Sequence, residues 1–160
     1  MLLALGDSHR NRIALDKIAE LIGTERPQLF VHTGDNFSDY KLLRKKTGIP
    51  GFGVRGNCDM GIIPGAKEEL IFSYAGKQIL LTHGHLYGVK YSLRDLHQRA
   101  EELGVDAVIF GHSHVALLER AGGIWLINPG SLSLPRRGSR PGFARIWVEE
   151  GEIKGELATL

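Results

Sequence analysis

Five short polar clusters in this chain of 160 residues carry side chains that bind metal ions or move protons. Each cluster directly follows an apolar run with the composition of a β-strand. The clusters are Asp7-Ser8-His9, Gly34-Asp35-Asn36, Gly56-Asn57-Cys58-Asp59, His83-Gly84-His85 and Gly111-His112-Ser113-His114. In α/β sheets, ligands bind in the crevice beyond the carboxyl ends of the strands, so strands that share a direction would bring the clusters into one site.

The residue types in these clusters predict metal binding. Imidazole and carboxylate groups together suit divalent transition metals such as Mn, Fe, Ni, Co or Zn, and the single cysteine argues against a structural zinc finger. One histidine or aspartate beside a glycine is as often a turn former as a ligand, but five of the seven histidines fall at predicted strand ends. So many ligands exceed the need of one ion and fit two ions that share a bridging carboxylate.

Apolar runs bounded by turn residues predict the strands that would position the clusters. In the first two thirds of the chain these runs cover residues 1–5, 29–31, 51–55, 70–74, 78–82 and 107–110. The final third contains further runs at residues 116–119, 124–128, 143–148 and 152–158. No helical period separates the last four runs, so this part of the chain is expected to be largely antiparallel.

Helices are predicted between the early strands. Apolar residues, beginning with Ile13, recur at roughly helical spacing over residues 13–22, and a polar, Lys-rich segment covers residues 39–46. Ser92 is expected to cap a third helix, which Gly104 would end. Early βα alternation followed by late hairpins predicts an α/β fold, with a mixed sheet or two packed sheets and helices outside.

Length and composition indicate one domain over residues 1–160. The chain is 42% hydrophobic and 24% charged, and its formal net charge of +2 is far from the basic excess of a dedicated nucleic-acid-binding protein. Cys58 has no partner for an intramolecular disulfide, and we recognise neither a secretory signal nor an apolar run of membrane-spanning length. The expected location is the cytoplasm, without a membrane partner, and a homo-oligomer is left open.

In their order along the chain, the five clusters resemble the motifs of the calcineurin-like metallophosphoesterase family, especially its compact bacterial and archaeal phosphodiesterase branch. The resemblance spans nearly the whole chain and extends to the segment Asn128-Pro129-Gly130-Ser131. It implies a four-layer αβ sandwich of two mixed β-sheets flanked by helices. The metal ligands that it implies are Asp7, His9, Asp35 and His114 for one ion, and Asp35, Asn57, His83 and His112 for the other, with Asp35 bridging both.

The same resemblance implies a dinuclear-metal phosphoesterase. A metal-bridging water or hydroxide would attack the phosphorus of a small phosphodiester in line with the leaving oxygen. Within this fold the alternatives are a phosphomonoesterase or a nuclease, and only the nuclease would have nucleic acid as its substrate. Outside enzymes the alternative is a protein-interaction scaffold, as in the retromer subunit of this fold, but every ligand position of the family pattern is filled here.

The residue that would protonate the leaving group is left open. Many relatives have a histidine directly after the asparagine ligand, whereas this chain has Cys58 after Asn57. Cys58 could donate the proton or take no part, and Asp59 or His85, the other catalytic candidates, could support the site instead. His85 is expected to contact phosphate or to orient ligands rather than to bind a metal ion directly.

Other motif matches are weaker. Residues 51–56 have the spacing of a dinucleotide-binding loop but lead into Asn57 rather than into a helix, and no nucleophile elbow surrounds Ser8. His32, in a strand run, and His97, on a helix, are expected to be structural or exposed. Residues 132–140 are expected to form a surface loop, either a lid or a connection, whose three arginines could recruit a phosphate but are more often solvated.

Overall fold

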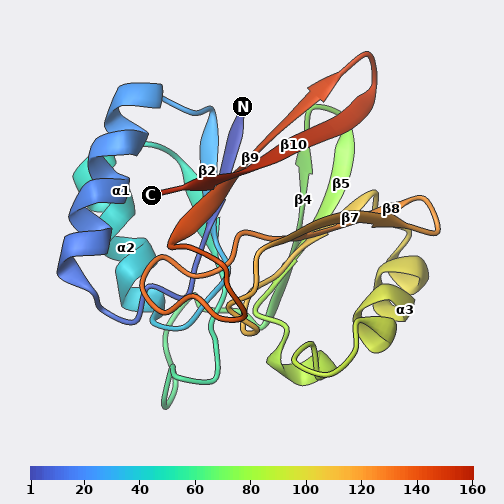
Figure 1. The fold of residues 1–160 in the computed structure, drawn as a ribbon, viewed down its shortest axis with the longest axis horizontal. Helices are drawn as coiled ribbons and strands as arrows, with labels where there is room; N and C mark the ends of the chain where they lie inside the picture. Colours follow the sequence, from blue (N-terminus) through green and yellow to red (C-terminus); the bar gives the residue numbers. More distant parts are fainter.

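Two mixed β-sheets pack face to face with helices on both outer faces, as Figure 1 shows for the computed structural model of residues 1–160. The first sheet has the strand order β10-β9-β1-β2-β3, and the second has the order β4-β5-β6-β8-β7. The predicted fold class, a four-layer αβ sandwich of two mixed sheets, is therefore confirmed. No helix combines the length and the apolar composition that a membrane span requires.

The strands form close to the predicted apolar runs. The first sheet contains β1 (Leu2–Leu5), β2 (Leu29–His32), β3 (Gly51–Gly53), β9 (Gly142–Glu149) and β10 (Glu152–Thr159). The second sheet contains β4 (Glu69–Tyr74), β5 (Lys77–Thr82), β6 (Ala107–Ile109), β7 (Leu117–Ala121) and β8 (Ile124–Asn128).

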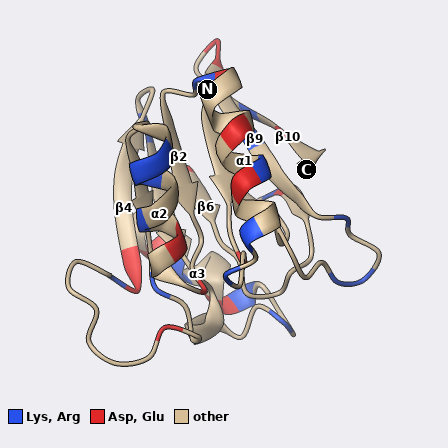
Figure 2. Ribbon diagram, turned by 90° about the vertical axis from the view of Figure 1, so that its left-hand side faces the viewer, with Lys and Arg blue, Asp and Glu red and all other residues tan.

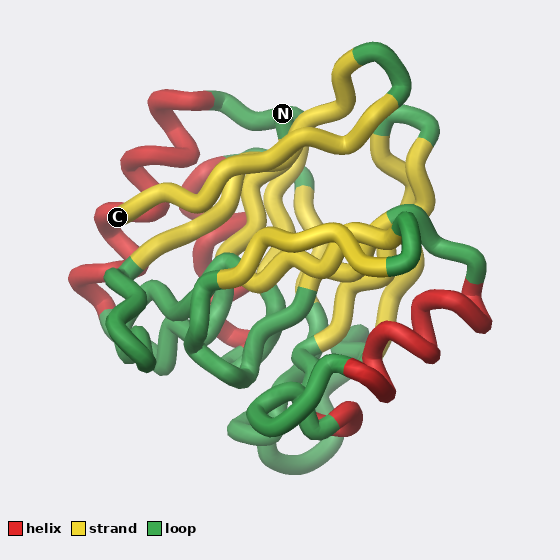
Figure 3. Tube along the Cα trace, turned by 45° about the vertical axis from the view of Figure 1, so that its right-hand side comes forward, coloured by secondary structure: helices red, strands yellow, loops and turns green.

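The helices cover the two sheets separately. Helices α1 (Arg12–Glu25) and α2 (Phe37–Thr47) lie side by side on the outer face of the first sheet (Figure 2). Helix α3 (Arg94–Leu103) lies against the second sheet (Figure 3), and a short 3₁₀ turn covers His85–Tyr87. Asn11 begins α1 because its side-chain oxygen accepts a hydrogen bond from the N–H of Ala14.

The alternation of side chains along β1 divides the interior into layers. Leu2 and Ala4 belong to the core between the two sheets, whereas Leu3 and Leu5 belong to the core under α1 and α2. All four are fully buried. A third apolar cluster joins α3 to the outer face of the second sheet, so every layer of the sandwich has its own packed interface.

Parallel strands run to the same edge in both sheets. In the first sheet β1 pairs in parallel with β2, and β2 pairs in parallel with β3. In the second sheet β6 pairs in parallel with both β5 and β8. The final third is largely antiparallel, as expected, in the pairs β7–β8, β9–β10 and β1–β9. The exception is the parallel pair of β8 with the distant β6, because β8 lies between β6 and its hairpin partner β7.

Three local predictions also differ from the structure. The side chain of Ile13 is 72% exposed, because the buried stripe of α1 runs through Ala14, Leu15, Ile18 and Ile22 instead. The third strand ends at Gly53, since the N–H of Arg55 bonds to Lys67 in the following loop. Helix α3 begins at Arg94 with Leu93 as its N-cap, although the hydroxyl of Ser92 still accepts from the N–H of Arg94.

We expect Leu3→Ala to lower the free energy of unfolding by about 2–5 kcal/mol, because it leaves a cavity between β1 and the two helices. The matched control is Leu157→Ala, on β10, whose side chain is 41% exposed and which should change stability by less than about 1 kcal/mol. Urea unfolding followed by circular dichroism measures both. Equal losses would contradict the assignment of Leu3 to a packed layer.

Candidate metal centre

The polar clusters predicted from the sequence lie together, beyond the carboxyl ends of parallel strands from both sheets. The first sheet supplies the segments after β1, β2 and β3, and the second supplies those after β5 and β6. Two sets of side chains in these segments have ligand atoms within 4.8 Å of one another. The sets are Asp7, His9, Asp35 and His114, and Asp35, His83 and His112.

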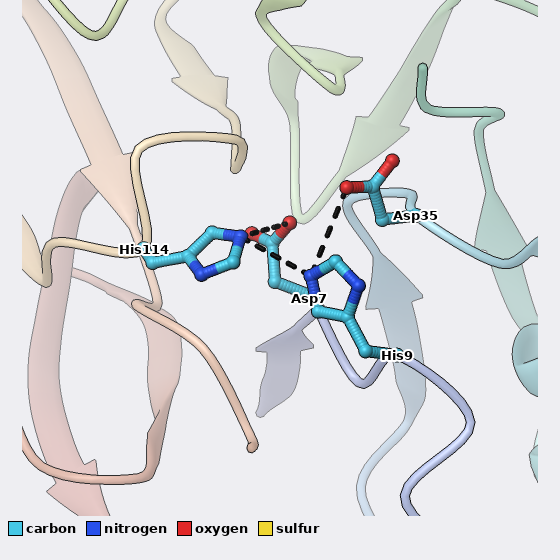
Figure 4. Close-up of side chains that lie close together, drawn as sticks. All are labelled: Asp7, His9, Asp35 and His114. Carbon is cyan, nitrogen blue, oxygen red and sulfur yellow. Dashed lines mark hydrogen bonds and ion pairs between the residues drawn. The ribbon is translucent and has the colours of Figure 1, made fainter. Parts of the chain in front are cut away.

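The first set gathers around the imidazole of His9 (Figure 4). The Nε2 atom of His9 lies 3.2 Å from Nε2 of His114 and 3.8 Å from Oδ2 of Asp35. The Nε2 atom of His114 lies 3.3 Å from Oδ1 of Asp7. Two carboxylates and two imidazoles from three separate loops therefore point toward one another.

The second set gathers around Nε2 of His83. This atom lies 3.3 Å from Oδ1 of Asp35 and 3.1 Å from Nδ1 of His112. The side-chain oxygen of Asn57 lies 3.1 Å from the same atom, so the amide predicted as a neutral ligand reaches this set as well. Asp35 uses Oδ2 toward the first set and Oδ1 toward the second, which is the arrangement expected of a bridging carboxylate.

Backbone carbonyls fix the orientation of two of the histidines. The Nδ1 atom of His83 donates to the carbonyl of Thr33 at 2.9 Å, and Nδ1 of His114 donates to the carbonyl of Leu134 at 2.7 Å. In the neutral ring, the lone pair of Nε2 then faces the site in both cases. Oδ1 of Asp7 is buried and receives no hydrogen bond. These electron-pair donors fit a divalent cation on either side of Asp35.

The ligand loops hold an unfavourable backbone conformation. Five of the predicted ligands have positive φ angles, a region that residues other than glycine seldom occupy. These are Asp7 (48°), His9 (47°), Asp35 (53°), His112 (65°) and His114 (59°). Such conformations persist only where surrounding contacts enforce them, and they are concentrated at functional sites.

Burial and neighbouring charges set the protonation of the site. Burial lowers the pKa of His112 to about 4, with further contributions from His83 and Lys90, so its ring is neutral at neutral pH and able to bind a metal ion. Burial opposes the ionisation of Asp35, but the nearby His83 and the hydrogen bonds from Cys58 outweigh it and lower the pKa of the carboxyl group. The carboxyl group of Asp35, which lies between the two sets, is therefore ionised at neutral pH.

Cys58 lies at the rim of the site and contacts Asp35 twice. Its N–H donates to Oδ1 of Asp35 at 3.0 Å, and its thiol donates to Oδ2 at 3.3 Å. Burial, together with the negative charge of Asp35, raises the pKa of this thiol to about 11. The thiol is therefore protonated near neutral pH and is not a ready nucleophile.

His85 lies beside the second set rather than in it. Its ring centroid is 5.3 Å from that of His83 and 6.0 Å from that of His112, and its Nε2 is 3.7 Å from a carboxylate oxygen of Glu68. Burial and the neighbouring His83 lower its pKa. The structure thus places His85 where a group bound at the ligands would be within its reach.

Asp59 is buried and bonded to the backbone of two loops. Its carboxylate accepts from the N–H groups of Gly56 at 2.9 Å, Asn36 at 3.2 Å and Phe37 at 2.8 Å. It therefore joins the loop that carries Asn57 to the loop that carries Asp35. From the sequence Asp59 was a candidate to support the site in place of Cys58, and a part in the reaction stays a prediction.

Several supporting residues were missed from the sequence. The hydroxyl of Ser8 donates to Asp39 at 2.7 Å and accepts from His32 at 3.1 Å, while the N–H of Gly34 donates to the other nitrogen of His32. Burial lowers the pKa of His32 to about 4, although the charge of Asp39 acts in the opposite direction. The ring of His32 is therefore neutral within this buried network. His32 is structural, as expected, but it supports two ligand loops.

The segment over residues 132–140 is attached to the site through His114. The carbonyl of Leu134 accepts a hydrogen bond from the His114 ring, and the N–H of Arg136 donates a hydrogen bond to the His114 carbonyl at 3.0 Å. The preceding turn is attached as well, since the hydroxyl of Ser131 donates to the carbonyl of Asp7 at 2.7 Å. No local sequence signal predicts these contacts, because they arise from segments more than a hundred residues apart or from loop packing.

The fold and the site define an αβ-sandwich protein with a candidate metal centre at the shared edge of its sheets. The model of the calcineurin-like phosphoesterase superfamily domain matches residues 1–151. The chain therefore belongs to the calcineurin-like phosphoesterase superfamily.

Relatives in sequence carry consistent descriptions. The chain is 38% identical over 148 residues to the probable metallophosphoesterase YsnB of Bacillus subtilis, covering 92% of this chain and 83% of the relative. It is 25% identical over 167 aligned positions to the phosphodiesterase YfcE of Escherichia coli, covering 91% of this chain and 86% of the relative.

Solved structures share the fold. A predicted phosphoesterase from Streptococcus pneumoniae superposes with a TM-score of 0.80 at 25% identity, over 96% of this chain and 86% of that one. A variant of Vps29 from Entamoeba histolytica superposes with a TM-score of 0.78 at 23% identity, over 97% and 96% of the two chains. At that identity the Vps29 match establishes the architecture alone.

We expect Asp59→Asn to destabilise the protein by about 1–3 kcal/mol, because an amide nitrogen would then face a backbone N–H. The affinity for Mn²⁺ should fall with it, since the loops that carry Asn57 and Asp35 lose their common acceptor. Thermal unfolding and calorimetric Mn²⁺ titration measure the two effects. Unchanged stability with a large loss of turnover would instead make Asp59 a participant in the reaction.

Proposed function

We propose that this chain is a metal-dependent phosphodiesterase that hydrolyses a small organic phosphodiester with two divalent ions bound on either side of Asp35. The observation that supports this most directly is the convergence of ligand atoms on two points that share the Asp35 carboxylate. Membership in the phosphoesterase superfamily supports a hydrolase, and the YfcE relative, named as a phosphodiesterase, supports a diester substrate.

The ligand set suits an anionic substrate. Only Asp7 and Asp35 contribute negative charge, whereas the other proposed ligands are imidazoles, which bind metal ions in their neutral form, and the amide of Asn57. Two divalent cations would leave such a site net positive, which attracts a phosphate group. Bound there, the ions would neutralise charge on the phosphate and lower the pKa of a water molecule so that it can attack phosphorus.

The chain's own residues would position the substrate around that chemistry. Asn57 and Cys58 lie at the exposed rim, and His85 lies beside the second set, so these three side chains can approach the phosphate oxygens or the leaving group. Asp59 would hold the loop of Asn57 in place. The nitrogen and oxygen ligands accept Mn, Ni, Co, Fe or Zn, and we propose Mn or Ni as the activating metals.

We further propose that the protein works in the cytoplasm as one domain over residues 1–160. Its single cysteine forms no disulfide, which suits a reducing compartment. Its proposed partner is a small phosphodiester rather than a membrane, with nucleic acid only as a possible substrate and assembly into a homo-oligomer left to measurement.

Chelator-stripped protein should not hydrolyse bis(p-nitrophenyl) phosphate, and activity should return when Mn²⁺ or Ni²⁺ is added. Asp35→Asn should lose more than about 100-fold in kcat/KM, because it removes the shared ligand of both ions. The matched control is Asp95→Asn, the same change at an exposed position on α3, which should retain activity.

The outcomes of this assay separate the rival functions. Faster turnover of the corresponding monoester, p-nitrophenyl phosphate, would favour a phosphomonoesterase. Folded protein that binds the ions by calorimetry but hydrolyses neither ester would favour the interaction scaffold.

Cys58→Ser should change the turnover of bis(p-nitrophenyl) phosphate by less than about threefold. A p-nitrophenolate leaving group departs without protonation, and serine retains a hydrogen-bond donor toward Asp35. Steady-state kinetics at saturating Mn²⁺ measures the effect. A loss of tenfold or more, with metal affinity unchanged, would assign the thiol a direct role in the reaction.

A further inference from the structure

A cavity of about 440 Å³ lies directly behind the loop that carries His112 and His114. Ser113, between these two residues, forms part of its wall, and Phe110 lies at its inner side. Other parts of its lining come from the segment after His85 and from residues 132–140. Figure 1 shows both segments on the lower side of the molecule, beyond the strand ends. Its volume is in the range of small-molecule sites.

The cavity is lined by cations without carboxylates. Lys90, Arg136 and Arg137 belong to its walls, and no aspartate or glutamate does. None of the three takes part in an ion pair within the protein. Lys90 is half-buried, and its ammonium group has no carboxylate partner. An anionic ligand would supply the missing partner.

Ser113 adds a directed donor to this wall. Its hydroxyl oxygen already accepts from the side-chain amide of Asn128 at 3.0 Å and from the N–H of Val115 at 3.3 Å. The hydroxyl proton has no acceptor in the protein and can be donated to a ligand oxygen. Together with the two guanidinium groups, this arrangement matches the three acceptor oxygens of a phosphate.

The rest of the cavity is apolar and aromatic. Six of its lining residues are hydrophobic, among them the buried Phe110 and the 95% exposed Tyr91 at the rim. An exposed tyrosine ring beside cations is a stacking surface for a flat heterocycle. One cavity thus combines a site for a flat, apolar group with a site for a second negative charge.

The cavity and the metal centre share a wall. The N–H of Arg136 bonds to the carbonyl of His114 at 3.0 Å, and Ser113 separates the two histidine ligands by a single residue. A ligand in the cavity that contacts Ser113 would therefore lie one residue along the loop from two of the proposed metal ligands.

We infer that the cavity binds the alcohol portion of a nucleotide-type phosphodiester, one that carries a flat base and a second phosphate. This inference rests on the proposed function for the position of the reacting phosphate. The base would contact Tyr91 and the apolar wall, while the second phosphate would contact the Arg136 and Arg137 guanidinium groups and the Lys90 ammonium group.

Three chromogenic diesters test the inference with Mn²⁺-loaded protein. They are bis(p-nitrophenyl) phosphate, thymidine 5′-(p-nitrophenyl phosphate) and the same nucleotide with an added 3′-phosphate. The wild type should prefer the 3′-phosphorylated ester by roughly tenfold or more in kcat/KM, and this preference should decrease with added salt. The double variant Arg136→Gln with Arg137→Gln should remove most of the preference, and its kcat/KM for bis(p-nitrophenyl) phosphate should fall far less than its kcat/KM for the 3′-phosphorylated ester.

The matched control is Arg140→Gln, an exposed arginine of the same segment that does not line the cavity. It should keep the preference. A wild type that treats both thymidine esters alike, or a double variant that loses all three substrates equally, would overturn the inference.

Calorimetry with thymidine 3′,5′-bisphosphate separates this inference from the proposed function. Binding that is weakened by the double variant and kept by Arg140→Gln, in protein that hydrolyses no ester, would retain the nucleotide site and reject the phosphodiesterase. Hydrolysis of bis(p-nitrophenyl) phosphate without any bisphosphate binding would do the reverse.

Discussion

The hydrogen bond from the N–H of His112 to the carboxylate of Asp7, at 3.0 Å, joins the two sheets at the edge where the candidate ligands lie. A second crossing bond runs from the ring of His83, in the second sheet, to the carbonyl of Thr33, in the first. Hydrophobic packing between the two sheets is not directional, so these bonds help to set how the strand ends of one sheet face those of the other. The relative position of the two ligand sets depends on these hydrogen bonds between the sheets, which we call the polar seam.

Close packing at the seam also explains the glycines that precede the ligands. A Cβ atom on Gly56 would lie 2.2 Å from Oδ1 of Asp35, and one on Gly111 would lie 2.7 Å from Oδ2 of Asp7. Neither glycine has a positive φ, so absence of a side chain, rather than backbone freedom, is what these positions require. The positive φ angles fall instead on the ligands themselves, which the seam holds in place.

The sequence predicted the strand-end clusters well because each depends on a local pattern, an apolar run followed by a polar turn. It did not predict the parallel pairing of β8 with β6, which depends on which strand enters the middle of the sheet. Nor could it predict that the Leu134 carbonyl would orient His114, since a backbone carbonyl has no sequence signature. The bonds of Asp59 to the backbone of two loops were out of reach for a related reason: its proximity in sequence to Asn57 says nothing about the direction of its carboxylate.

The same seam separates two chemical tasks in the proposed enzyme. Residues between the sheets are buried and held by several bonds each, which suits ligands that must not move when charge develops on the substrate. Lys90, Arg136 and Arg137, by contrast, lie on segments outside the sheets, and their charged groups are free of internal ion pairs. Substitutions in those segments can alter which diester is accepted while they keep the bond that supports His114, because that bond comes from the backbone N–H of Arg136. In the proposed enzyme the residues at the strand ends would therefore carry out the reaction, whereas the surrounding loops would determine which substrate is accepted.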